Sequence, residues 1–183
     1  MLGSQQGRKA AGVDEREFEK VYWELHPQLL RHAKHYLDPT GAEDIASVTM
    51  WKVWDEGLAY PASVEEQREL RAFAFRVLTN NIRNEYRARK RRKNLRHALA
   101  AKEAIRPQYQ DDTAATDSRL TIDRWLSLLS ESDRDVILLF NAGFTAEKIA
   151  NILGCSPSAA AKRCSRARTR LRSIVEAEGR SPL

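Results

Sequence analysis

The sequence has little of what marks a secreted, membrane-bound or metal-binding protein. Its two cysteines, Cys155 and Cys164, form no Cys-x-x-Cys pair and have no histidine near them in the sequence, so we expect both to pack in the interior. The N-terminal segment contains no apolar core, which argues against a signal peptide. No stretch approaches the roughly 20 apolar residues that span a bilayer. These absences predict a soluble, cytoplasmic protein without membrane insertion.

Groups of residues that carry catalysis are also missing. The sequence has no Gly-rich phosphate loop, no cluster with metal-ligand spacing and no nucleophile with an evident base. Its four histidines are scattered. Two of them, His32 and His35, share one expected helix, but they have no acidic partner there, so we expect them to be exposed on its surface. The sequence therefore predicts a protein that is not an enzyme and that has no cofactor, no metal and no small-molecule substrate.

Charge, in contrast, is abundant and unevenly placed. The chain of 183 residues has 31 Lys and Arg against 25 Asp and Glu, which gives a net charge of +6 and a pI of about 9.5. Two basic runs contain no acid, at residues 87–96 and 162–172. Either run alone is compatible with a solvated basic surface. Two such runs at the ends of expected helices favour a nucleic acid as partner.

The apolar pattern indicates helices throughout. Helical spacing runs over residues 18–37, where Pro27 should kink or restart the helix, and turn residues 38–41 end it. A second helix is expected at residues 42–55, with apolar residues on more than one face, and a third at residues 64–100. No alternating strand pattern is present, so we expect an all-α fold.

A Pro-containing acidic stretch, residues 101–118, separates the helical segments and predicts a flexible linker. We therefore expect two small helical domains. The expected organisation is a disordered lead at 1–13, a first domain at 14–98, a linker at 99–118, a second domain at 119–176 and a tail at 177–183.

The start of the second domain has its own signals. Ser130, followed three residues later by Asp133, resembles a capping box. The helix that follows should cover residues 133–140 and end at the Asn-Ala-Gly of residues 141–143.

Residues 145–171 have the layout of a DNA-binding helix-turn-helix. Thr145 can cap a helix that starts at Ala146, and Gly154 can end it in the left-handed conformation. Ser156 and Pro157 can then begin a recognition helix after a short turn. Candidate DNA contacts are Ser158, Lys162, Arg163 and Arg166, and the alanines at 159–161 could touch thymine methyl groups. A helical hairpin that packs on a partner protein is the alternative.

The segment LSESDRDVILLFNAGFTAEKIANILGCSPSAAAKRCSRARTRLR resembles region four of bacterial sigma factors, which reads the minus-thirty-five element. The segment GAEDIASVTMWKVW resembles the stretch of region two that binds core RNA polymerase, and LRAFAFRVLTNNIRNEYRARKRR resembles the helix that engages the minus-ten element. Region order and length are similar to those of the extracytoplasmic-function (ECF) class, the smallest sigma factors.

The resemblance implies a sigma factor that directs promoter recognition, DNA melting and transcription initiation. Its partners would be core RNA polymerase, promoter DNA and an anti-sigma factor. The implied polymerase contacts are Asp44, Ile45, Ser47, Met50, Trp51 and Trp54. The implied minus-ten contacts are Tyr60, in a loop that holds an unstacked base, with Arg76, Asn80, Asn84, Arg87 and Arg89. The implied minus-thirty-five contacts are Ser156, Ser158, Lys162, Arg163, Arg166 and Arg168.

The chain departs from the family pattern at three places. Ser47 and Val48 replace Gln and an acid, Phe73 replaces a common Trp, and alanines occupy residues 159–161 of the recognition helix. Two other functions remain open from the sequence. A stand-alone helix-turn-helix regulator usually dimerises, and no segment here indicates a dimer interface. A helical adaptor could be formed by residues 15–98.

Overall fold

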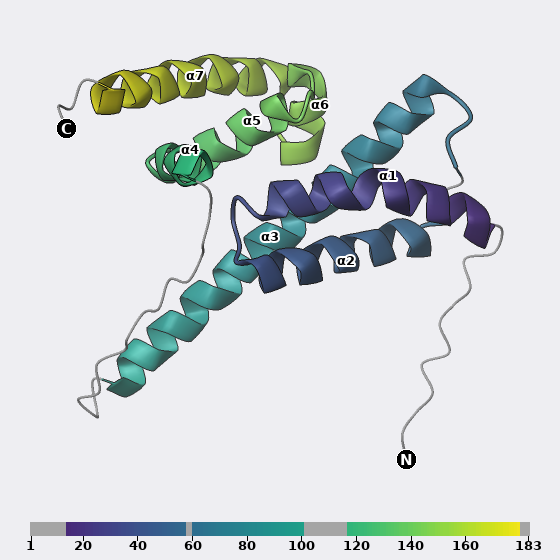
Figure 1. Ribbon diagram of the computed structural model, residues 1–183, viewed down its shortest axis with the longest axis horizontal. Helices are drawn as coiled ribbons and strands as arrows, with labels where there is room; N and C mark the ends of the chain where they lie inside the picture. Colours follow the sequence, from purple (N-terminus) through teal and green to yellow (C-terminus); the bar gives the residue numbers. More distant parts are fainter. Residues whose placement is uncertain (1–13, 58–59, 101–116, 180–183) are drawn as a thin grey trace. The chain divides into compact units, whose positions relative to one another are not determined.

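The computed structural model describes residues 14–57, 60–100 and 117–179, and all regular structure among them is α-helical (Figure 1), which confirms the predicted fold class. The expected lead at 1–13 and most of the expected linker lie outside the described residues. The helices are α1 (Glu15–Ala33), α2 (Pro39–Asp55), α3 (Val64–Ala100), α4 (Asp117–Ser127), α5 (Glu131–Asn141), α6 (Ala146–Leu153) and α7 (Pro157–Gly179).

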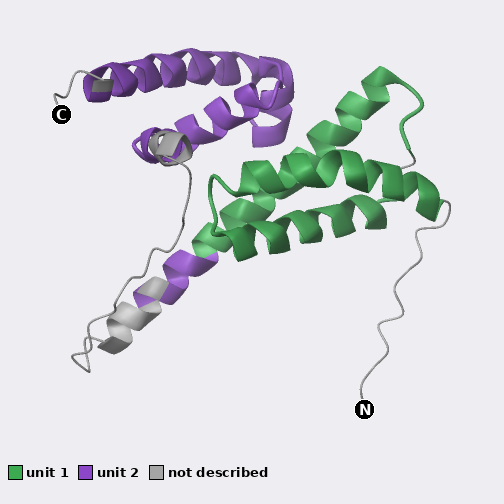
Figure 2. Cartoon of the chain, viewed as in Figure 1, with its two compact units in different colours: residues 1–87 green, residues 88–183 purple. Residues whose placement is uncertain are grey.

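The chain divides into two compact units, residues 1–87 and residues 88–183 (Figure 2). The first unit contains α1, α2 and most of α3, and the second contains α4 to α7. The division falls within α3, before the boundary at residue 98 that the sequence suggests. Each unit has its own buried core.

In the first unit, α1 and α2 form an antiparallel pair (Figure 1). The carboxylate of Asp14 caps α1 by accepting a hydrogen bond of 3.1 Å from the backbone N–H of Arg16. Pro27 lies inside α1 at an exposed position, and the helix does not restart there. Of the two effects expected of Pro27, a kink or a restart, the restart does not occur, because tertiary packing of a long helix can outweigh one missing backbone bond.

The second helix begins earlier than predicted. Asp38 accepts a hydrogen bond of 3.3 Å from the N–H of Gly41, and Pro39 takes the first helical position. Proline costs nothing there, since that N–H has no helical partner in any case. The Asp-Pro-Thr-Gly sequence therefore starts α2 rather than forming only the turn before it.

Helix α3 closes the core of the first unit. Leu29, Met50, Val53, Phe75 and Leu78, from all three helices, are almost completely buried. This apolar contact area is what holds α3 on the α1–α2 pair.

Two histidines belong to that core, and the prediction that His32 is exposed is therefore wrong. His26 is 9% exposed and His32 is 6% exposed. The His32 ring meets Phe75 edge-on, with 5.2 Å between ring centroids. Burial, with a smaller effect from His35, lowers the pKa of His32 to about 3, so this side chain is neutral at physiological pH.

In the second unit, the predicted helix-turn-helix is confirmed. Thr145 caps α6 by accepting from the N–H of Lys148, and Gly154 has a φ of 68° at the end of α6. Ser156 accepts a 3.2 Å hydrogen bond from the N–H of Ala159 at the start of α7. The turn thus consists of the three residues predicted from the sequence.

The predicted capping box is only half formed. Ser130 Oγ accepts a hydrogen bond of 3.2 Å from the N–H of Asp133, and α5 begins at Glu131. The carboxylate of Asp133 does not complete the box, because it pairs with Arg170 of α7. Asp has a shorter side chain than the Glu that usually reaches back to the cap, and here a cation is available instead.

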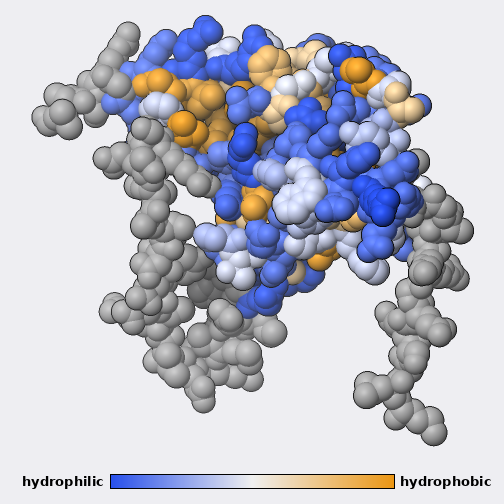
Figure 3. Space-filling view, turned by 45° about the vertical axis from the view of Figure 1, so that its right-hand side comes forward, coloured by the Kyte–Doolittle hydropathy of each residue, from blue (hydrophilic) through white to orange (hydrophobic). Residues whose placement is uncertain are grey.

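Hydrophilic side chains dominate the face drawn in Figure 3, and apolar side chains form separate patches on it. Large apolar residues are nonetheless exposed in both units. They include Trp23, Val48 and Trp51 in the first unit and Leu128 and Phe140 in the second. None of the described helices combines the length and the apolar character needed to cross a membrane.

Candidate nucleic-acid and polymerase interfaces

The outer face of α2 presents most of the side chains implied as polymerase contacts. Asp44 and Ser47 are exposed, and Trp51 is 61% exposed. Ile45 and Trp54 are half-buried. Met50 differs, because it is 2% exposed and packs in the core. A partner on this face would therefore contact mainly Trp51, because Met50 lies beneath the surface.

Helix α1 extends this face through residues that sequence reasoning missed. An α1–α2 groove of about 380 Å³ is lined by Glu15, Phe18, Tyr22, Ser47, Met50, Trp51 and Trp54. The Phe18 ring meets Trp54 edge-on, with 4.7 Å between centroids. Phe18 and Tyr22 are one helical turn apart, which was a usable signal, but only the packing shows that they join α2.

The middle of α3 carries a polar groove against α2. This α2–α3 groove, of about 440 Å³, is lined by Lys52, Val77, Asn80, Asn81, Arg83, Asn84 and Arg87. It unites three of the implied minus-ten residues: Asn80, Asn84 and Arg87. The Nη1 of Arg87 donates to Oδ1 of Asn84 over 3.3 Å. Arg76 and Arg89 are exposed but do not line the groove, and the guanidinium of Arg76 lies over the Phe73 ring, 5.4 Å from its centroid.

Tyr60 does not line this groove either. Its hydroxyl donates to Oε1 of Glu24 over 3.1 Å, and Lys20 Nζ lies 5.4 Å from the centroid of its ring. The hydrogen bond to Glu24, together with the charge of that carboxylate, raises the pKa of the Tyr60 phenol. Tyr60 is therefore held by α1, and the structure does not unite it with Asn80, Asn84 and Arg87.

The recognition helix α7 exposes a narrower set of side chains than its sequence suggests. Ser158, Lys162 and Arg166 are exposed, whereas Arg163 is half-buried. Ala160 is fully buried, so it cannot touch thymine methyl groups. Ser156 is occupied as the helix cap, and its Oγ lies 3.2 Å from that of Ser158. The exposed face thus combines small side chains with the long cations Lys162, Arg166 and Arg168.

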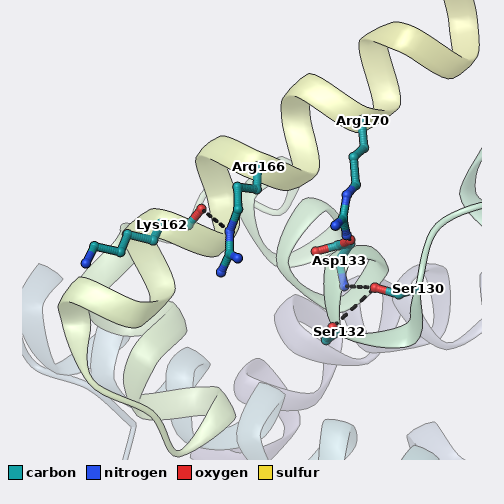
Figure 4. Close-up of polar contacts among 6 residues, drawn as sticks. All are labelled: Ser130, Ser132, Asp133, Lys162, Arg166 and Arg170. Carbon is teal, nitrogen blue, oxygen red and sulfur yellow. Dashed lines mark hydrogen bonds and ion pairs between the residues drawn. The ribbon is translucent and has the colours of Figure 1, made fainter.

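The arginines of α7 have different roles. Arg170 and Asp133 point toward one another and form an ion pair, whereas Lys162 extends away from them (Figure 4). Arg168 lies over the Phe140 ring, 5.0 Å from its centroid, and Arg166 Nε donates to the carbonyl of Lys162 over 3.4 Å. The ion pair joins α5 to α7, so Arg170 serves the fold rather than the exposed basic surface.

Further polar contacts fasten α4. Arg134 Nε donates to the carbonyl of Leu126 over 2.9 Å. The carboxylate of Glu178 accepts from Trp125 Nε1 over 2.8 Å and pairs with Arg124 over 3.1 Å. These bonds join α4 to α5 and to the C-terminal part of α7. Cys164 in α7 is buried, and this burial raises the pKa of its thiol, whereas Cys155 is only half-buried.

Two protein-family models match the chain, in the order that the sequence suggests. Sigma-70 region 2 matches residues 21–92, and Sigma-70 region 4 matches residues 119–171. Together they cover well over half of the chain, which therefore belongs to the sigma-70 family of RNA polymerase sigma factors. Its function is promoter recognition in transcription initiation, and the family is not one of enzymes. None of the curated proteins matches the chain.

Two solved structures have a similar fold. One is the co-crystal structure of the sigma factor RpoE with the anti-sigma factor NepR from Bartonella quintana, at 23% identity and a TM-score of 0.62, with 88% of this chain and 98% of that chain covered. The other is the structure of CnrH in complex with the cytosolic domain of CnrY, at 23% identity and a TM-score of 0.64, with 92% and 93% covered. At this identity the likeness concerns the fold.

Proposed function

We propose that this chain is a sigma factor of the ECF class that joins core RNA polymerase and brings it to promoters. It acts where polymerase and the chromosome are, in the cytoplasm. The observation that carries the proposal is the presence, on one chain, of a groove lined by amides and cations on α3 and a helix-turn-helix on α6 and α7. The groove on α3 suits an opened DNA strand, and the helix-turn-helix suits duplex DNA.

Polymerase binding is assigned to the outer face of α2. Trp51 and Val48 are 61% and 48% exposed, beside the polar Asp44 and Ser47. Exposed tryptophans are frequent energetic centres of protein interfaces, and polar groups around them set orientation. The family's Gln and acid are absent next to Asp44, so the apolar part of the contact carries more of the affinity in this chain.

DNA contacts are assigned to both units. Asn80, Asn84 and Arg87 contact the opened minus-ten strand, with Arg76 and Arg89 along the same helix. Ser158, Lys162, Arg166 and Arg168 contact the minus-thirty-five duplex, with Arg163 at the edge of that surface. Long cations among small side chains provide mainly phosphate contact, so base discrimination by α7 is modest.

An anti-sigma factor is proposed as a further partner. Both similar structures are complexes: RpoE with the anti-sigma factor NepR, and CnrH with the cytosolic domain of CnrY. In this chain the exposed Trp51 and Val48 would be shielded by such a partner until polymerase binds. A pull-down from the native cell that recovers only polymerase contradicts this partner.

Reconstitution with purified core polymerase tests the proposal. We expect run-off transcripts from fragments of the native genome, and gel shifts of the resulting promoters with the holoenzyme but not with the chain alone. Tight promoter binding by the chain alone indicates a stand-alone regulator instead. Failure to associate with core overturns the proposal.

A pair of tryptophan variants tests the polymerase surface. Trp51→Ala should weaken association with core by roughly 30-fold or more, since truncation of a central interface Trp costs about 2 kcal/mol or more. Trp23→Ala is the matched control, because Trp23 is similarly exposed, at 68%, and lies outside the proposed polymerase contacts. Equal losses in the two variants contradict the assignment.

A further inference from the structure

The α2–α3 groove has an unusual chemical composition for a surface hollow. Of its seven lining residues, three are amides (Asn80, Asn81 and Asn84), three are cations (Lys52, Arg83 and Arg87) and one is apolar (Val77). None of these lining residues is acidic. Its volume of about 440 Å³ lies within the range of small-ligand sites, about 300–1,000 Å³.

This composition matches the two parts of a nucleotide. Lysine and arginine neutralise phosphates, and asparagine side chains offer both a donor and acceptor to base edges. An anionic ligand with an aromatic base therefore suits the groove better than a cation or an apolar peptide. The Val77 side chain supplies an apolar surface at the same place.

Lys52 is the residue of this groove that comes from α2, whereas the other six come from α3. It lies next to Trp51 in the sequence but faces a different way. Residues 49 and 52 lie one helical turn apart on the side of α2 that meets α3, whereas residues 44, 47 and 51 share another side, at helical spacings of three and four. The polymerase surface and the groove are thus two faces of one helix.

A partly buried hydrogen-bond chain sets α2 against α3 beside Lys52. Asn81 Nδ2 donates to Thr49 Oγ1 over 3.2 Å, and Thr49 Oγ1 donates to the carbonyl of Ile45 over 2.7 Å. Thr49 is 0% exposed. The Thr49 hydroxyl is buried and makes two hydrogen bonds, one as donor and one as acceptor. Loss of a partner for such a buried group costs about 1–3 kcal/mol, so these bonds fix how α2 lies along α3.

We propose that Lys52 is a phosphate contact for the opened promoter strand and that the Asn81–Thr49 hydrogen bond positions it in the α2–α3 groove. This inference rests on the proposed function. Helix α2 then binds polymerase on one face and the opened promoter strand on another. When polymerase fixes the position of α2, it therefore also fixes the position of Lys52. Thr49 and Asn81 act as positioning residues.

The first test measures the salt dependence of strand binding by the reconstituted holoenzyme. The probe is a short random-sequence single-stranded oligodeoxynucleotide, with core polymerase alone as the background. Lys52→Gln should reduce the slope of log affinity against log salt by about 0.7, the value for one phosphate contact on a single strand. Association with core should stay unchanged. Arg31→Gln, which removes an exposed cation on α1, is the matched control and should leave the slope as in the unmodified chain.

The second test separates positioning from general stability. Thr49→Val keeps the shape but removes the acceptor for Asn81, and should weaken strand binding several-fold while core association is retained. Thr49→Ser keeps the hydroxyl and should restore binding. Thr79→Val is the control, since Thr79 is also buried but its hydroxyl donates only to the carbonyl of Phe75 in its own helix.

A double variant shows whether Thr49 acts through Lys52. If it does, Thr49→Val combined with Lys52→Gln loses little more strand affinity than Lys52→Gln alone. Additive losses overturn the positioning role. A functional holoenzyme whose Lys52→Gln variant keeps the full salt slope overturns the phosphate contact alone, whereas a chain that forms no holoenzyme overturns the proposed function and this inference with it.

Discussion

The two units use their positive charge differently. In the first unit, Lys52 and Arg87 line a concave groove together with amides. In the second unit, Arg170 pairs with Asp133 and Arg134 donates to the carbonyl of Leu126, so these cations are part of what holds the helices together.

Both units also have an apolar core of buried side chains. Three long helices in the first unit bury large side chains such as Phe75, Met50 and Leu29. The second unit has three shorter helices beside α7, and its two terminal helices meet through polar contacts of Arg124, Trp125 and Glu178. A dense arginine run therefore does not equal a DNA-binding surface, because some members stabilise the fold.

The largest expected effect tests whether the units are independent. Leu29→Ala and Leu139→Ala each remove a fully buried side chain, one in each unit, and each should cost about 2–5 kcal/mol of local stability. Amide hydrogen exchange, followed peptide by peptide, should show faster exchange only in α1, α2 and the part of α3 that belongs to the first unit for the first variant, and only in α4 to α7 for the second. Faster exchange in both units from either substitution contradicts separate cores.

The next largest effect is expected from loss of the Arg170–Asp133 ion pair in the second unit. Arg170→Met leaves the Asp133 carboxylate, which is 7% exposed, without its cation. We expect a loss of about 1–3 kcal/mol in the free energy of unfolding, less than for a fully buried pair because Arg170 itself is 61% exposed. Urea unfolding measures this loss. Arg166→Met, on the same helix, should change stability by about 0.5 kcal/mol or less; an equal loss in both variants means that the pair is unimportant.

A pH titration should affect the first unit more than the second. Burial lowers the folded-state pKa of His32 from 6.5 to about 3, so protons favour the unfolded state. The stability from neutral His32 is complete above pH 6.5 and is lost as the pH falls from 6.5 toward 3. The slope approaches about 1.4 kcal/mol per pH unit for one proton.

Hydrogen exchange in α1 and α3 measures this pH effect. His32→Gln should flatten the slope. Helices α4 to α7 contain no histidine in their sequence, so they supply the internal reference. An unchanged slope in the His32→Gln variant assigns the pH dependence to other groups.

A smaller effect is expected at the turn of the helix-turn-helix. Gly154 has a φ of 68°, and a Cβ added there meets no atom within 4 Å. The cost of Gly154→Ala is therefore backbone strain alone, about 1–2 kcal/mol. Thermal unfolding of the second unit measures it, and Gly154→Asn should recover part of the loss because Asn tolerates this conformation better.

The smallest effect concerns the binding of duplex DNA. It separates the cations of α7 that contact DNA from those that stabilise the fold. Lys162→Gln should lower the salt slope of holoenzyme binding to its promoter by about 0.9, equivalent to one phosphate on duplex DNA. Arg170→Met should leave the slope unchanged, provided that binding is measured where the variant is folded. A reduced slope for Arg170→Met would place that side chain on DNA after all.

Local features were predictable where neighbours in the sequence decide them. Thr145, Gly154 and Ser156 define the helix-turn-helix through caps and one left-handed residue, and the structure confirms each. The start of α3 at Val64 was also predicted. The start of α2 was not, because the Asp-Pro pair was interpreted as the end of a segment although it also fits the beginning of a helix.

Interactions between distant residues were not predictable. The hydroxyl of Tyr60 donates a hydrogen bond to Glu24, far away in the sequence. His32 was expected to be exposed on its helix but is buried. Periodicity shows that a helix has faces, but not which partner each face meets.

From the sequence alone came the all-α class, the two regions with their order, and the helix-turn-helix, since these depend on spacing, caps and turn residues that lie close together in the chain. The tertiary structure alone decided that Lys52 joins Asn80 and Asn84 in a groove, and that Arg170 is committed to Asp133. Helix packing brings such side chains together across tens of residues, and no local pattern encodes which of two similar cations will find a carboxylate and which will remain on the surface.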